Sequence, residues 1–180
     1  MLTNNTCVKA IGEIGLDFYR DHVPPKEQMD RFIFQLDFAA RTALPVILHQ
    51  RQSSEELIKI LETSFVNNHK NSIKGVFHAF NGERNILEFA IAHGFMLGIG
   101  GAITYNSSKS WLGIFTDIPL SIILLETDSP FLAPQSLRGT RNVPQNTYIV
   151  ATKLAEIYSV PVDKIIDTTC ENANRMFQWH

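Results

Sequence analysis

The fold is indicated most clearly by the stretch Leu124-Leu125-Glu126-Thr127-Asp128-Ser129-Pro130. An apolar run, 121–125, leads directly into two acidic residues and then stops at a proline. Such a run is typical of a strand that is buried on both faces, as strands are in parallel sheets covered by helices. Asp128 then follows the carboxyl end of the strand, where α/β sheets place their chemistry. The sequence therefore predicts a parallel sheet with a functional site at this rim.

Four earlier apolar runs repeat the pattern, and stretches with helical spacing separate them. The predicted strands are 8–14, 46–48, the short run within 74–78, and 95–99. Strand and helix alternating with short loops predict parallel strands joined by right-handed crossovers. An eight-stranded βα barrel normally needs about 250 residues. Five strands in 180 residues therefore fit either part of such a barrel or a complete open sheet.

Composition narrows the class of protein. The chain is 44% hydrophobic and 19% charged, with a net charge of −2, so it has neither a disordered composition nor a basic field that would hold nucleic acid by charge alone. Two cysteines are too few for a disulfide framework. No apolar run approaches the roughly 18 residues of a membrane span, and the opening residues lack the apolar core of a signal peptide. We expect a single domain over residues 1–180, without a membrane segment and in the cytoplasm.

Four residues are candidate metal ligands because each follows or ends a different predicted strand. They are Glu13, His49, His78 and Asp128. A single histidine near a strand end is more often a hydrogen-bonded structural residue. Four such residues on four strands favour a shared site, since carboxylates and imidazoles together bind zinc and similar divalent ions.

Neighbouring charged residues allow two interpretations each. Asp17 and Glu126 are placed to orient the histidines from behind, but they equally suit caps of loops or turns. Arg51 and Arg141 are candidates for gripping phosphate oxygens, whereas solvated loop charges or salt bridges are the alternative. Arg51 is the stronger of the two because it lies two residues after His49.

At these residues the sequence resembles the TatD family of metal-dependent deoxyribonucleases, which are amidohydrolase-like metallo-barrels. The matching segments are 12–17, 45–49, 75–82, 124–130, 138–142 and 171–173, in the family's order. The resemblance implies that Glu13 bridges two divalent ions (Zn, Mg or Mn) and that His49 and His78 complete one of the sites. It also implies that Asp128 belongs to the other site and helps to activate the attacking water, with Glu13 and Asp128 as the catalytic residues and DNA as the substrate.

Three departures from the family pattern shape the expectation. Gln50 follows His49 where the family has serine or threonine, and Val143 replaces a glutamate. The third is larger, because the family's first three strands, with a His-x-His metal pair, have no counterpart here. The resemblance thus implies an N-terminally truncated, partial TIM barrel of about five parallel strands, corresponding to the C-terminal part of the eight.

The expected function is cleavage of phosphodiester bonds in DNA, impaired by the missing histidine pair. The alternatives are hydrolysis of another ester or amide, such as an aminoacyl-tRNA, and a catalytically inactive fragment. A partial barrel also exposes two sheet edges and an apolar inner face. We therefore expect the chain to be marginally stable, to self-associate through these edges, or to fold with the helices after Pro144 displaced to cover the opening.

Overall fold

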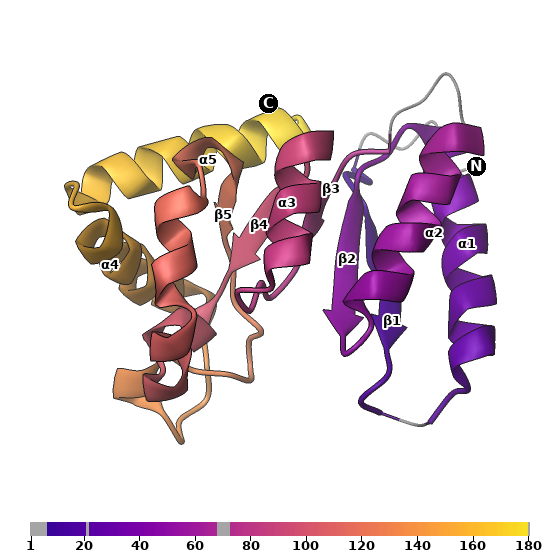
Figure 1. Ribbon diagram of the computed structural model, residues 1–180. Helices are drawn as coiled ribbons and strands as arrows, with labels where there is room; N and C mark the ends of the chain where they lie inside the picture. Colours follow the sequence, from indigo (N-terminus) through magenta and orange to yellow (C-terminus); the bar gives the residue numbers. More distant parts are fainter. Residues whose placement is uncertain (1–6, 21, 68–72, 180) are drawn as a thin grey trace.

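The computed structural model describes residues 7–20, 22–67 and 73–179. Five parallel strands form one sheet in the order β1-β2-β3-β4-β5, which is also their order along the chain. The strands are β1 (Ile11–Asp17), β2 (Val46–Arg51), β3 (Gly75–Phe77), β4 (Met96–Ile99) and β5 (Ile123–Leu125). The α-helices are α1 (Pro25–Thr42), α2 (Ser54–Asn67), α3 (Arg84–His93), α4 (Thr147–Tyr158) and α5 (Val162–Phe177), and Figure 1 shows their arrangement.

The predicted architecture of five parallel strands is confirmed, but the first two strands end later in the sequence than predicted. The first strand runs three residues further than expected, so Glu13 lies inside β1 and Asp17 ends it. The second also extends, to Arg51, which places His49 within β2. Both extensions have the same cause, because residues 14–17 pair in register with residues 48–51. Hydrogen bonding between β1 and β2 therefore extends both strands beyond their apolar residues and into the polar residues that follow.

One face of the sheet carries the main core. Alternate strand residues such as Leu16, Leu48 and Phe77 point to this face and are at most 1% exposed. Helix α1 begins immediately after Pro24, because a proline suits the first helical turn. Its buried residues Phe32, Leu36, Ala39 and Ala40 recur at helical spacing and join the same core.

The opposite face, which we call the inner face, carries a second and smaller apolar cluster. Val76, Met96 and Leu124 lie on three adjacent strands, and the end of α5 packs Met176 and Phe177 against them. Figure 1 shows α5 crossing the amino-terminal ends of the strands. The end of α5 therefore covers part of the inner face, at Val76, Met96 and Leu124.

Helix α5 also protects the free edge of β5. The Asn172 side chain, 1% exposed, donates hydrogen bonds from Nδ2 to the carbonyls of Leu120 (2.9 Å) and Ile123 (2.8 Å). Arg175 donates from Nη2 to the Ser121 carbonyl at 2.6 Å. Unpaired carbonyls at a sheet edge invite pairing with other chains, and these side chains satisfy the Ile123 carbonyl of β5 and two carbonyls of the 3₁₀ turn just before it. The edge is therefore less open than the sequence suggested.

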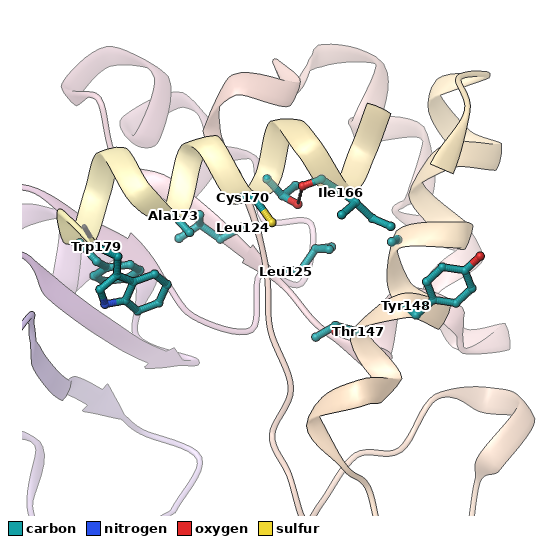
Figure 2. A pocket seen from close by; sticks show the side chains of 11 residues that line it. Leu124, Leu125, Thr147, Tyr148, Ile166, Cys170, Ala173 and Trp179 are labelled. Carbon is teal, nitrogen blue, oxygen red and sulfur yellow. Dashed lines mark hydrogen bonds between the residues drawn. The ribbon is translucent and has the colours of Figure 1, made fainter. Parts of the chain in front are cut away.

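Beyond these contacts, an apolar cavity of about 340 Å³ flanks β5 between α4 and α5. Figure 2 shows Leu124 and Leu125 at its floor, with Tyr148 of α4 and Cys170 of α5 at its sides. At the far end of α5, Lys9 donates from Nζ to the Gln178 carbonyl at 3.0 Å, which ties the residues before β1 to those after α5. In the described part of the chain, no helix combines the length and apolarity needed to cross a membrane.

Candidate functional site

A cavity of about 1320 Å³ opens on the inner face beyond the apolar cluster. Its lining includes Glu13 from β1, His49 from β2, His78 after β3, and Glu126 and Asp128 after β5. Parallel pairing brings these positions to one rim. The structure therefore gathers all four candidate metal ligands in a single cavity.

Glu13 reaches the inner face because β1 is irregular there. The register of β1 against β2 shifts between Ile11 and Ile14, both of which contact the main core. These two core residues are three positions apart in β1, whereas their partners in β2 are two positions apart. Strand β1 therefore contains one extra residue, which forms a bulge at Glu13. Gly12 allows the close approach, since a Cβ there would lie 2.6 Å from the Ile47 Cβ. Gly15 has φ +138°, and a side chain there would collide with the His49 carbonyl oxygen.

His78 lies at the centre of the cluster. Its Nε2 is 2.9 Å from Asp128 Oδ1 and 3.9 Å from Glu13 Oε1, while its Nδ1 is 3.0 Å from Glu126 Oε2. The side chain is 11% exposed. One ring nitrogen thus faces the cavity carboxylates, and Glu126 fixes the orientation of the ring from behind.

The electrostatics of His78 and Asp128 follow from this geometry. Burial disfavours the imidazolium and lowers the His78 pKa, but hydrogen bonds to Asp128 and Glu126, together with their charges, outweigh it and raise the pKa to about 10. The hydrogen bond from His78 in turn holds the pKa of Asp128 below its usual value, although burial opposes the shift. Without a bound cation, His78 is therefore protonated and Asp128 ionised at neutral pH.

His49 is held between two other carboxylates. Its Nδ1 is 3.7 Å from Glu13 Oε2, and its Nε2 is 3.5 Å from Asp17 Oδ2. The other oxygen of Asp17, Oδ1, accepts hydrogen bonds from the backbone N–H groups of Tyr19 (3.0 Å) and Arg20 (3.1 Å). Asp17 therefore fits both interpretations, because it caps the loop after β1 and also faces His49.

Glu126 likewise has both oxygens engaged. Besides its contact with His78, it accepts a hydrogen bond at Oε1 from the backbone N–H of Ala79 at 2.6 Å. Its carboxylate packs so closely on Gly98 of β4 that a Cβ there would overlap Oε2. Sequence reasoning placed Glu126 correctly but missed Gly98, because only the pairing of β4 with β5 shows which residue faces the carboxylate.

The two predicted phosphate-binding arginines lie in different places. Arg51 lines the cavity, and its guanidinium lies 3.8 Å from the centre of the Tyr19 ring. Arg20, which comes from the loop after β1, lines the cavity as well. Arg141 is exposed and does not belong to the lining of the cavity. The next residue, Asn142, donates its backbone N–H to the Pro130 carbonyl at 3.0 Å, so the loop lies beside the rim and the role of Arg141 stays a prediction.

The donor set fits a divalent cation in its chemistry. Four carboxylates surround two imidazoles, which gives a rim with an excess of negative charge and the nitrogen and oxygen ligands that zinc accepts. Within the described ranges, however, no three His, Cys, Asp or Glu side chains stand in an arrangement that could already hold a metal ion. Binding therefore requires side chains such as Glu13, 51% exposed, to move closer to the histidines.

The chain matches known proteins over most of its length. Residues 1–178 match the family model described as TatD related DNase. The chain is 34% identical to the uncharacterized metal-dependent hydrolase YabD of Bacillus subtilis, covering 95% of this chain and 66% of that protein. It is 35% identical to the 3'-5' ssDNA/RNA exonuclease TatD of Pectobacterium atrosepticum, covering 98% and 68%.

The solved structures agree as well. The TatD homologue YJJV of Escherichia coli K12 superposes with a TM-score of 0.86 and 31% identity, covering 96% of this chain and 65% of that one. The chain thus spans about two thirds of the length of these relatives. The superposition confirms the predicted fold class, because the five-stranded sheet matches part of a TatD structure. This chain belongs to the TatD-related DNase family.

Proposed function

We propose that the chain acts as a metal-dependent phosphodiester hydrolase on DNA. The observation that carries the proposal is the gathering of Glu13, His49, His78 and Asp128 on one rim, with Arg51 beside them. Relatives named as metal-dependent hydrolases and as an ssDNA/RNA exonuclease support both the cofactor and the substrate class. The chain spans about two thirds of the length of those relatives. We therefore propose the activity, the divalent ion and the nucleic-acid substrate for this chain and do not transfer them from the relatives directly.

Each residue has a role that its position allows. Glu13, His49, His78 and Asp128 would hold the divalent ions, and a bound ion lowers the pKa of water from 15.7 towards about 7. Asp128, ionised at neutral pH, accepts a proton from the attacking water. Glu126 and Asp17 position His78 and His49. Arg51 holds the phosphate oxygens of the substrate.

Turnover should be slow relative to the longer relatives. The described ligand side chains do not surround an ion in their present positions. They must move together to bind one, and this movement uses part of the free energy of ion binding. Loss of one well-placed electrostatic contribution typically costs about 10²–10³ in rate. We expect one divalent ion to bind through Glu13, His49 and His78, and a second to bind weakly.

The test is hydrolysis of end-labelled single-stranded DNA, RNA and a simple ester with Mg²⁺, Mn²⁺ or Zn²⁺ added. Asp128→Asn should abolish cleavage, and His49→Ala should remove the ion detected by metal analysis after dialysis. The control is Asp117→Asn, which alters an exposed carboxylate paired with Arg84 at 2.9 Å outside the cavity lining. Cleavage that survives Asp128→Asn would refute the proposal, whereas turnover of the ester alone would indicate a different substrate class.

A further inference from the structure

The cavity that holds the carboxylates and histidines also holds an aromatic side chain that packs into no core. Phe131 lines the cavity three residues after Asp128 and is 72% exposed. Such exposure is unusual, since phenylalanine is among the residues most often buried. Its neighbour Leu132 lines the same cavity and is 51% exposed. An apolar surface therefore borders the charged rim.

The backbone around Phe131 is fixed on both sides. The Phe131 N–H donates to the Asp128 carbonyl at 2.6 Å, and the Phe131 carbonyl accepts from Asn142 Nδ2 at 2.8 Å. Asn142 is itself 1% exposed, so this support is buried. Two residues further on, the Ala133 carbonyl accepts a hydrogen bond from the Tyr105 hydroxyl at 2.9 Å. Phe131 is thus held in place in spite of its exposure.

Positive charge lies on the opposite side of the same cavity. Arg20 and Arg51 come from the ends of β1 and β2, whereas Phe131 follows β5 at the other edge of the sheet. The carboxylate and imidazole groups lie between them. Guanidinium groups suit phosphate oxygens, and an exposed aromatic ring suits the face of an unpaired base. One wall therefore fits the backbone of a nucleic acid and the other fits its bases.

We propose that Phe131 forms a subsite on which an unpaired nucleobase stacks while Arg20 and Arg51 on the opposite side of the cavity hold the phosphate backbone. This inference rests on the proposed function, because it takes the substrate to be a nucleic acid. A base buried in a duplex cannot offer its face to the ring, so the subsite selects single-stranded or frayed ends. It recognises a base by its π face and therefore does not distinguish sequence.

Binding without metal separates this subsite from the chemistry. The probes are a fluorescein-labelled oligothymidylate of about ten nucleotides and an abasic oligomer with the same backbone charge, measured by fluorescence anisotropy in EDTA. Wild-type protein should bind the oligothymidylate at least about five-fold more tightly, since stacking on an aromatic side chain is worth about 1–3 kcal/mol per base. Phe131→Ala should remove that preference, with the abasic affinity unchanged.

Three further variants control for shape and for general apolar surface. Phe131→Leu keeps an apolar side chain without a ring and should lose the preference, whereas Phe131→Trp should keep it. Phe34→Ala alters an equally exposed ring, 68% exposed on α1 and outside the cavity, and should change neither affinity. Circular dichroism of each variant checks that the fold is retained.

The outcomes distinguish the inference from the function on which it rests. Equal affinity of wild-type protein for the two oligomers, including no measurable binding of either, would overturn the subsite. So would an unchanged preference in Phe131→Ala. Hydrolysis of bis(p-nitrophenyl) phosphate with added metal, which needs no base, reports on the proposed chemistry separately. Base preference without any hydrolysis would overturn the proposed function and leave the subsite standing.

Discussion

At the scale of single residues, His78 makes the stability of the metal-free protein depend on pH. Its folded pKa of about 10 lies above the ordinary 6.5, so its contribution to stability is complete below about pH 6.5 and is lost as the pH rises towards 10. Asp128 has a lowered pKa, so its contribution is present above about pH 4 and is lost on acidification. In EDTA, the melting temperature should fall between pH 7 and 10, as differential scanning calorimetry would record.

The matched controls for this prediction are two histidine variants. His78→Gln should flatten the decline above pH 7, because the group that titrates is gone. His93→Gln changes a histidine at the end of α3, outside the lining of the large cavity, and should leave the decline in place. A profile that stays level in wild-type protein would show that the contacts of His78 with Asp128 and Glu126 do not persist in solution.

Gly98 gives a second prediction at this scale, because it makes room for Glu126. In Gly98→Ala the new methyl group overlaps the Glu126 carboxylate, a flexible group that can move away at little cost to the fold. The pKa of His78 should fall, since one of its two closest carboxylates leaves, and hydrolysis should fall with it. Imidazole titration by NMR in EDTA measures the first effect. Gly113→Ala, where a Cβ meets nothing within 4 Å, should behave like wild type.

The chemical identity of the site residues was readable from sequence, and so were Asp17 and Glu126 as partners of the histidines. Histidine and acid at strand ends pointed to Glu13, His49, His78 and Asp128, all of which line one cavity. Phe131 escaped notice because phenylalanine is among the residues most often buried. Only its hydrogen-bonded loop and its 72% exposure distinguish it.

At the scale of secondary structure, Asn172 is the side chain on which the edge of β5 depends. Replacement by alanine leaves the Leu120 and Ile123 carbonyls without their donor, and a buried unsatisfied polar group costs about 1–3 kcal/mol. Urea denaturation of Asn172→Ala should show a loss of that order, together with self-association measured by light scattering. Asn174→Ala, two positions along α5 at an exposed site, is the control. Equal stability of the two variants would show that the edge needs no capping.

Helices and strands were predicted well where the spacing of apolar residues was regular. They were predicted poorly where pairing with a neighbouring strand decided where an element begins or ends. Helix α1 follows its apolar spacing from Pro25 onwards. The fifth strand, by contrast, keeps only Ile123–Leu125, because residues 120–122 form a tight 3₁₀ turn before it. Residues on either side of Trp111, Asn106–Ser110 and Leu112–Asp117, likewise form 3₁₀ turns. Local composition does not distinguish such turns from an α-helix or a strand.

At the scale of the whole molecule, the inner face is covered mainly by the end of α5. Met176, 8% exposed, packs with Val76, Met96 and Leu124, so Met176→Ala should cost about 2 kcal/mol or more and raise the fluorescence of a dye that binds apolar surface. The control is Ile91→Ala, at a side chain 49% exposed on α3. A variant as stable and as dye-silent as wild type would mean that α5 does not shield this face.

Self-association stays a prediction at the same scale. Both β1 and β5 lie at the edges of the described sheet, and the apolar cavity beside β5 adds to the surface available to a second copy. Sequence alone left open whether five strands form part of a barrel or an open sheet. That choice depends on contacts between residues far apart in the chain, such as Lys9 with Gln178, which no local pattern reveals.

The order of the strands bears on how the chain is made. Each strand pairs with the one synthesised just before it, and none has to be inserted between two that are already paired. The sheet can therefore grow on the ribosome from β1 to β5, with each crossover helix covering the pair that has just formed. Helix α5 leaves the ribosome after all five of these strands, and its end packs on β3, β4 and β5 while Gln178, just after it, accepts a hydrogen bond from Lys9. Stalled nascent chains should accordingly gain protease resistance in steps, and the inner face should become protected only when residues 176–178 have emerged.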